Sequence, residues 1–251
     1  MNHHRNKTKE RGEPDLLRFY RRVTDLRPAT KRTVQPLYPL VVIGTGGHAV
    51  SVANVARSAG FSIKHFIDRK RRTDKLLGID LISDISELAN IHQYCFCIAV
   101  GDNAVRERLF AELSAKYSNL IFPSLIHSSA VISDYAEIGE GTVVMPRAVV
   151  GPNSHIGRFC ILNTQSSIDH DSSMSDYASL APGVVTGGTV NIGIRSAISI
   201  GAVIKHGTNV GDDCVVGANS YLNKDLSPCC VAYGTPAKVV RERSVGDPYF
   251  Q

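Results

Sequence analysis

His170 has the densest polar surroundings of any histidine in the sequence, because Asp169 and Asp171 flank it and the polar run 163–167 precedes it. A carboxylate beside a histidine fixes its tautomer and stabilises the imidazolium, so such a ring can accept a proton near neutral pH. Adjacent residues of an extended chain face opposite ways, so only one of the two aspartates can serve the ring. The spacing leaves two interpretations open, a general base or a histidine that is merely exposed.

A glycine-rich loop is the second candidate for chemistry. The residues GTGGH (44–48) directly follow the apolar run 40–43. Glycines at the start of a helix let backbone amides approach a phosphate, whose charge the helix N-terminus favours. Helical spacing over 49–59 and an apolar strand over 61–67 complete the first unit of a Rossmann-like domain. Asp68 ends that strand, at a position that commonly receives a ribose.

This first domain is small. Only one further strand and helix pair follows, at residues 94–100 and 104–117, and residues 120–122 add a short last strand. Roughly 85 residues can bind one nucleotide but fall short of a dinucleotide site. The sequence therefore favours a domain that binds a nucleotide-linked substrate over one that only caps the rest of the chain.

A period of six residues runs without insertion from Leu125 to Leu226. The second place of the hexad is Ile, Leu, Val or Met in sixteen of seventeen repeats, and Thr186 is the exception. The sixth place is small, being Ala, Ser, Thr or Cys in fourteen repeats. This period predicts a β-solenoid in which each hexad forms one short strand and a turn, with the second side chain inside. His170 takes a fourth place of its hexad, so its side chain should project outward. Thr186 breaks the apolar rule of the second place, which predicts either a local bend or a harmless bulge there.

The repeat resembles that of the hexapeptide acyltransferases, whose fold is a left-handed parallel β-helix with three hexads per coil. The segments VVIGTGGHAVSVANVA (41–56), AVGDNAVRERL (99–109) and VAYGTPAKVVRE (231–242) are together similar to the bacterial sugar O-/N-acyltransferases. That family includes N-acetyltransferases of nucleotide-linked 4-amino sugars and sialic acid O-acetyltransferases. The resemblance covers about residues 40–242 and implies a homotrimer with acetyl-CoA in the groove between neighbouring β-helices.

The expected fold is an α/β Rossmann-like N-terminal domain followed by an all-β, left-handed parallel β-helix of hexapeptide repeats. We expect a basic extension over 1–36, a nucleotide-sugar-binding domain over 37–123, a β-helix acyltransferase domain over 124–229, and a C-terminal tail over 230–251.

The resemblance also implies roles for three groups of residues. The catalytic group is His170 as general base, Asp171 as its orienting carboxylate and Asn163 as a supporting polar residue. The nucleotide-linked sugar would contact Gly46, Gly47, His48, Asp68, Arg69 and Gly101. Acetyl-CoA would contact Ser179, Gly188, Ile200 and Ala218, with the Gly188 amide facing the thioester. Ser179 is a departure, because many relatives carry a histidine at that position.

The implied activity is direct, acetyl-CoA-dependent N-acetylation of a nucleotide-linked amino-deoxy sugar in surface polysaccharide biosynthesis. Two alternatives share the repeat, namely O-acetylation of a sugar of the sialic acid type and a solenoid scaffold without catalysis. The glycine–histidine loop and Asp68 favour the nucleotide-linked acceptor, and His170 with Gly188 argues against the scaffold. No metal is expected, because His155, His170 and His206 occupy hexad places one, four and four, which does not suggest a shared face.

Composition sets further limits. Charged residues make up 20% and apolar residues 43% of the chain, as in ordinary globular proteins. The sequence shows no membrane-length apolar run, and residues 1–11 lack the apolar core of a signal peptide, so we expect a cytoplasmic location. Six cysteines show neither metal spacing nor a disulfide framework. Residues 1–36 carry ten Lys/Arg and four Asp/Glu, which we interpret as a solvated extension with a possible short helix over 15–23, not as an arm that binds nucleic acid or membrane.

Overall fold

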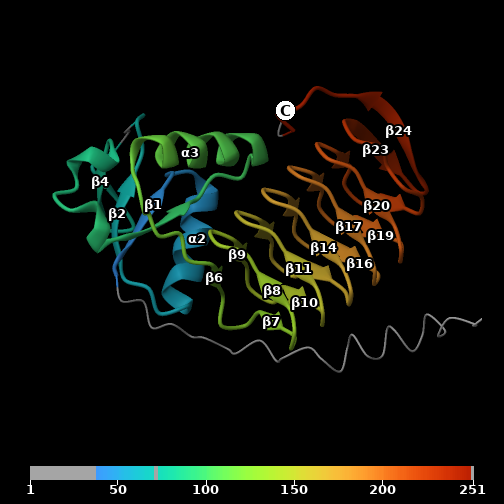
Figure 1. Ribbon diagram of the computed structural model, residues 1–251, viewed down its shortest axis with the longest axis horizontal. Coiled ribbons are helices and arrows are strands. Elements are labelled where there is room, and N and C mark those ends of the chain that lie inside the picture. The colour runs from blue at the N-terminus through green and yellow to red at the C-terminus, as the bar shows by residue number, and fades with distance from the viewer. Residues whose placement is uncertain (1–37, 71–72, 250–251) are drawn as a thin grey trace, which may run out of the picture.

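The computed structural model describes residues 38–70 and 73–249, so the expected extension 1–36 lies outside the described residues. Figure 1 shows an α/β domain beside a long stack of β-coils. The expected fold class, an α/β domain followed by a left-handed parallel β-helix, is confirmed. Within the described residues, no helix is long and apolar enough to cross a membrane. All six cysteines are free thiols, as the sequence predicts.

The N-terminal domain is a five-stranded sheet with a helix on each face. Its strands are β1 (Leu40–Ile43), β2 (Ile63–Ile67), β3 (Lys75–Leu76), β4 (Ile79–Ile82) and β5 (Cys95–Ile98), in the order β3-β4-β2-β1-β5. Its helices are α2 (Gly47–Ser58), α3 (Asn103–Lys116) and the short 3-10 turns η1 (Ile85–Glu87) and η2 (Ile91–Gln93). All neighbouring strands are parallel except β3 and β4, which form a hairpin.

The two long helices cover opposite faces of this sheet because alternate side chains of a strand point to opposite sides. Helix α2 packs with Leu40 and Val42, whereas α3 packs with Val41, Ile43 and Phe96. The sequence predicted these strands and helices to within a few residues but missed the β3–β4 hairpin. The strand expected at 120–122 is reduced to a single bridge between Ile121 and Cys95.

The β-helix has seventeen strands of two residues, one at the first two places of each hexad. They are β6 (Leu125–Ile126), β7 (Val131–Ile132), β8 (Glu137–Ile138), β9 (Val143–Val144), β10 (Val149–Val150), β11 (His155–Ile156), β12 (Ile161–Leu162), β13 (Ser167–Ile168), β14 (Ser173–Met174), β15 (Ser179–Leu180), β16 (Val185–Thr186), β17 (Asn191–Ile192), β18 (Ala197–Ile198), β19 (Val203–Ile204), β20 (Asn209–Val210), β21 (Val215–Val216) and β22 (Tyr221–Leu222). Each strand pairs in parallel with the strand three hexads away, so three hexads make one coil.

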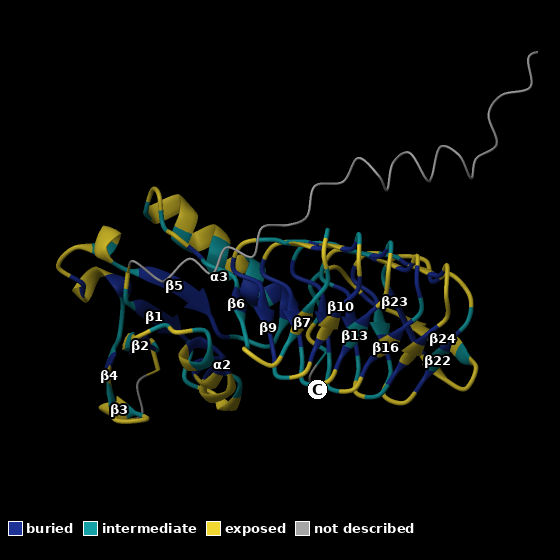
Figure 2. Ribbon diagram, turned by 90° about the horizontal axis from the view of Figure 1, so that it is seen from below, coloured by how far each residue is buried: buried dark blue, intermediate teal, exposed yellow. Residues whose placement is uncertain are grey.

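The coils form a prism with three sheet faces. Face 1 holds β6, β9, β12, β15, β18 and β21, and it is extended by the antiparallel pair β23 (Cys230–Gly234) and β24 (Ala237–Glu242). Face 2 holds β7, β10, β13, β16, β19 and β22, and face 3 holds β8, β11, β14, β17 and β20. Figure 2 shows buried residues, in dark blue, along the strands of the prism, and their side chains form its core.

The second hexad place has the inward environment that the pattern predicts. Second-place and sixth-place side chains fill the core of the prism. The fifth place takes a positive φ in coil after coil, as at Asn153 (57°) and Asp171 (54°), and this is where the chain turns the corner. Thr186 stays buried in its strand, but its hydroxyl accepts a hydrogen bond of 3.2 Å from the Asp169 amide. The exception therefore changes the local hydrogen bonding without inserting a residue.

Aromatic side chains fix the N-terminal domain on the prism. Phe159 and Tyr177 take fifth places in successive coils and stack with their ring centroids 5.6 Å apart. Phe110 of α3 packs on Phe159 at 4.4 Å between centroids. Arg106 lies buried at this contact and donates five hydrogen bonds, four of them to backbone carbonyls from both domains and one to Asn103. This anchoring sets where the carboxyl ends of β1 and β5 lie against the β-helix.

Candidate active site

A cavity of about 700 Å³, here called the first cavity, opens at the carboxyl ends of β1, β2 and β5. Ligands of open α/β sheets bind at this edge because the loops there can converge on them. All six residues predicted to contact the nucleotide-linked sugar line the first cavity: Gly46, Gly47, His48, Asp68, Arg69 and Gly101.

The glycines of the 44–48 loop serve two different purposes. Gly44 has φ 119°, and a Cβ there would lie 2.8 Å from the carbonyl oxygen of Ala99, so close packing on β5 requires glycine. Gly46 and Gly47 face open space, where no protein atom lies within 4 Å of an added Cβ. Gly46 also begins α2 without any side-chain cap. The start of α2 is therefore open to an anion.

Charged side chains border the far side of the first cavity. Asp68 accepts a hydrogen bond of 2.8 Å from the Lys70 amide and another from the Thr45 hydroxyl. The Arg69 guanidinium forms an exposed ion pair with Glu112 of α3 at 3.2 Å. The Asp68 carboxylate is thus held at the end of β2, in the place predicted for a ribose contact.

A second cavity of about 330 Å³ lies between face 1 and the N-terminal domain. It is lined by three of the four predicted coenzyme contacts, Ser179, Ile200 and Ala218, and by Asn163. His48 and Gly101 line both cavities, so the two cavities meet at these residues. If one molecule binds in each cavity, a chemical group can be transferred between them only at the junction formed by His48 and Gly101.

His48 is neutral at physiological pH. Burial lowers its pKa to about 4, and the positive charge of Arg106 acts in the same direction. Its Nε2 atom is buried and has no hydrogen-bond partner within the described residues. A buried polar atom left unpaired is costly, so the ring is suited to a polar partner supplied by a ligand at the junction.

His170 projects from the corner between faces 2 and 3, as the fourth hexad place predicts. Its Nδ1 lies 2.7 Å from Asp171 Oδ2, and this hydrogen bond raises the pKa of the imidazole. Asn153 donates to the other oxygen of Asp171 at 2.6 Å. Asp169 instead accepts from the backbone amide of His170 at 2.8 Å. Of the two aspartates only Asp171 orients the ring, and the His170 side chain stays 47% exposed.

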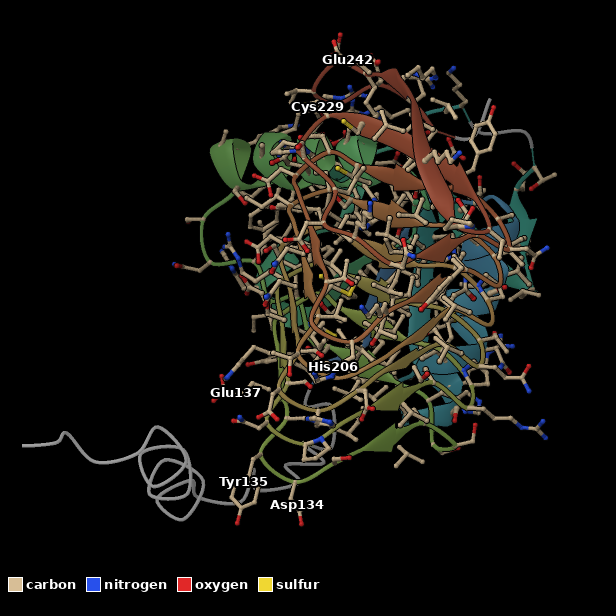
Figure 3. All side chains as sticks on the ribbon, turned by 90° about the vertical axis from the view of Figure 1, so that its right-hand side faces the viewer. Asp134, Tyr135, Glu137, His206, Cys229 and Glu242 are labelled. Atoms are coloured by element: carbon tan, nitrogen blue, oxygen red, sulfur yellow. The ribbon has the colours of Figure 1, made fainter. Side chains whose placement is uncertain are left out.

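Gly188 lies directly beneath this ring, one coil along the same corner. A Cβ at position 188 would overlap the His170 imidazole. One coil further, the ring of His206, labelled in Figure 3, lies 6.3 Å from that of His170 between centroids. These two histidines therefore share a corner, whereas His155 pairs with Glu137 on face 3, so the three histidines do not lie together. No group of three or more potential metal ligands forms among residues 38–70 and 73–249.

One chain does not unite all the predicted catalytic residues. His170, Asp171 and Gly188 lie at the corner between faces 2 and 3, whereas Asn163 follows β12 at the corner between faces 1 and 2. Asn163 lines the second cavity, but the other three do not. The coenzyme contact expected at Gly188 stays a prediction, because within this chain the residue accommodates the His170 ring.

Burial raises the thiol pKa of four of the six cysteines, Cys95, Cys97, Cys160 and Cys214. The pKa of Cys97 and that of Cys160 reach about 12, so both remain neutral thiols. Sequence reasoning missed two residues near the second cavity, Arg106 and Tyr249. An arginine one turn into a helix resembles surface charge, and the segment after β24 carries no motif.

The chain resembles known proteins over both of its domains. The PglD N-terminal domain family matches residues 39–113. The GDP-perosamine N-acetyltransferase of Escherichia coli O157:H7 is 31% identical over 143 residues, which are 57% of this chain and 64% of that protein. The alignment thus spans slightly less than two thirds of that relative.

Two solved structures align over nearly their whole length. The acetyltransferase domain of PglB from Neisseria gonorrhoeae, in complex with acetyl coenzyme A, is 32% identical with a TM-score of 0.76, covering 80% of this chain and 98% of that chain. PerB from Caulobacter crescentus, in complex with CoA and GDP-perosamine, is 29% identical with a TM-score of 0.74, covering 85% of this chain and 99% of that chain.

Proposed function

This chain belongs to the hexapeptide-repeat sugar acyltransferases, and we propose that it transfers the acetyl group of acetyl-CoA to the amino group of a nucleotide-linked amino-deoxy sugar. The observation that carries this proposal is the junction of two cavities at His48 and Gly101. A nucleotide-sized cavity on an α/β domain opens there into a second cavity on a β-helix. Transfer between two bound substrates needs such a meeting point.

The nucleotide-linked sugar occupies the first cavity in this proposal. Its phosphates lie at the start of α2, where Gly46 and Gly47 leave room for them. Asp68 accepts hydrogen bonds from the ribose, and the sugar extends toward His48. The unpaired Nε2 of His48 then pairs with the sugar near its amino group.

Acetyl-CoA occupies the second cavity along Ser179, Ile200 and Ala218. Its thioester lies at the junction, and its remaining length follows face 1. The exposed side chain of Ile200 suits contact with an elongated ligand, because it is 59% accessible in the single chain.

The transfer is a direct attack. The amine nitrogen of the sugar attacks the thioester carbonyl carbon, and His170 Nε2 accepts the proton that the nitrogen loses. The tetrahedral intermediate collapses as the carbon–sulfur bond breaks, and the proton returns to the leaving thiolate. The products are the N-acetylated sugar and CoA thiol. Asp171 stabilises the transient imidazolium through its hydrogen bond to Nδ1.

The faces of the prism support a homotrimer. The N-terminal domain covers part of face 1, and face 3 presents polar first-place residues such as Ser173, Asn191 and Asn209. Face 2 instead carries a valine stripe, defined as Val131, Val149, Val185 and Val203, whose members are 37–55% exposed. Association of three copies covers this stripe. It also sets His170, at the edge of face 2, beside the second cavity of a neighbour and thus near Asn163.

This activity suits a cytoplasmic enzyme, because acetyl-CoA and nucleotide-linked sugars are made there. The N-acetylated product serves surface polysaccharide biosynthesis.

The test measures CoA thiol release from acetyl-CoA with UDP-, dTDP- and GDP-linked 4-amino sugars, for wild type and for His170→Ala. We expect release with one amino sugar and its loss in the variant, with the oligomer mass unchanged. Release only with hydroxyl acceptors would replace this proposal by sugar O-acetylation. No release with any acceptor, together with no acetyl-CoA binding, would leave a scaffold without catalysis.

A further inference from the structure

The segment that follows β24 returns to the junction of the two cavities. Figure 1 shows this chain turning back from β24 toward α3. Tyr249, near its end, lines the second cavity together with His48 and Gly101. We propose that Tyr249 is a specificity-determining residue, whose ring limits the acyl group that the second cavity accepts. This inference rests on the proposed acyl transfer and adds a residue outside the repeat.

A buried polar network anchors the segment. The Arg243 guanidinium is buried and donates to the carbonyl oxygens of Asp213, at 3.0 Å, and of Asp247. The Gly246 amide donates to the Asp213 carboxylate at 3.1 Å. The same carboxylate receives two hydrogen bonds from Arg195, at 2.5 and 3.0 Å. The turn that leads to Tyr249 is therefore fixed to the last coils of the prism.

The Tyr249 hydroxyl is fixed by both domains. It lies 2.8 Å from the carbonyl oxygen of Gly101 and 3.1 Å from Asn103 Oδ1, and the Ser179 hydroxyl lies 3.3 Å away. Burial raises the pKa of the phenol, so it stays protonated and can donate its one hydrogen toward Gly101 or Asn103 while accepting from Ser179. These contacts hold the aromatic ring in one place.

The ring forms a wall of the second cavity and does not fill it. The cavity retains its 330 Å³ with Tyr249 in position, and its other walls include Ser179 and Leu180. The acyl group must lie where the two cavities meet, because the amine reaches it from the first cavity. A rigid ring beside Gly101 at that place limits how far an acyl chain can extend.

The experiment compares acetyl-, propionyl- and butyryl-CoA with one amino-sugar acceptor and measures kcat/KM for each donor. We expect Tyr249→Ala to raise the butyryl-to-acetyl ratio of kcat/KM by about fifteenfold, since butyryl has two more methylenes than acetyl and each that finds room is worth about fourfold. Tyr249→Phe keeps the ring and should keep the ratio, while the KM for acetyl-CoA rises a few-fold. Tyr38→Ala, which removes an exposed tyrosine outside both cavities, is the matched control.

The ratio does not depend on the fraction of folded enzyme, because that fraction cancels between donors. Tyr249→Leu, which keeps an apolar contact, should give a smaller shift in the same direction and replaces the alanine variant if that variant does not fold. An unchanged ratio in a variant that still acetylates would overturn the role of Tyr249 alone. A wild type that transfers no acyl group to any acceptor would instead refute the proposed function, and this inference with it.

Discussion

The imidazole of His170 lies over the α-carbon of Gly188, its counterpart one coil further along the prism. Any side chain at position 188 would overlap the ring, so the glycine leaves room for the orientation that the hydrogen bond to Asp171 gives the imidazole. The relationship depends on the coil length of eighteen residues, which stacks equivalent hexad places at one corner.

We expect Gly188→Ala to lower kcat by about a hundredfold, because His170, the proposed base, would be displaced and lose most of its contribution to proton transfer. The fold should survive, since the ring is exposed and can swing away. The control is Gly207→Ala at the same corner, where the φ of 70° strains any side chain but an added Cβ meets no atom within 4 Å, so it costs stability without touching the ring. Steady-state kinetics measure the loss of kcat, and thermal unfolding measures any loss of stability. A fully active Gly188→Ala variant would contradict the steric role of Gly188.

Asp171→Asn should change the pH profile of the enzyme. The proposed base must be neutral, and the hydrogen bond that His170 donates to Asp171 raises the pKa of the imidazole, so wild-type activity is lost as the pH falls through this raised value. In the variant that pKa falls, and the acidic limb of kcat/KM moves to lower pH. The plateau also drops, because an amide that donates to Nδ1 leaves the proton on Nε2. Asparagine tolerates the positive φ of residue 171.

The matched control for this variant is Asp169→Asn. Asp169 accepts from the His170 backbone and acts on the ring only through its charge. We expect a smaller displacement of the acidic limb and little change in the plateau. Equal effects of the two substitutions on the plateau would show that the hydrogen bond to Asp171 has no special role.

His48→Asn should raise the KM for the amino sugar by about three- to tenfold, the usual worth of a hydrogen bond, and change kcat less. The pKa of His48 is about 4, so its charge does not change between pH 6 and 8 and the KM should show no titration from this residue there. His92→Asn, an exposed histidine of η2, is the control. A protonation step near pH 6.5 that disappears with His48 would contradict the buried, neutral ring.

Val185→Asp should dissociate the proposed homotrimer and abolish most activity, because a charge in the valine stripe must be desolvated on association. Asn191→Asp adds the same charge to polar face 3 and should leave the mass unchanged. Light scattering coupled to size exclusion gives the masses. A Val185→Asp variant that keeps the mass of a trimer would show that face 2 is not the interface.

The hexad pattern predicted the β-helix strand by strand, because each place has one environment that recurs in every coil. Thr186 illustrates the limit of this rule. Its hydroxyl replaces a backbone acceptor for Asp169, which a pattern of apolar and small residues does not encode. The α/β domain was predicted from its strand–loop–helix order, but the β3–β4 hairpin is too short and too polar to give a periodic signal.

The sequence predicted the residues of the first cavity better than it predicted those around His170 and the second cavity. The six residues predicted to contact the sugar each come shortly after β1, β2 or β5. The strand pattern of the local sequence was therefore enough to predict that they lie at one edge of the sheet. The relation of Asn163 to His170 needed the coil length, which puts them at different corners. Tyr249 was beyond sequence reasoning, because its partner Gly101 is 148 positions away along the chain.

The hairpin of β23 and β24 has a consequence for how the molecule avoids polymerising. A stack of parallel coils ends in unpaired backbone groups that invite another chain to continue it. Here β24 runs antiparallel to β23, so face 1 ends in a strand of the wrong direction for a further parallel coil. Lys238 and Arg241 add charge along that strand. The prism is thereby closed to end-to-end growth into a fibre on this face.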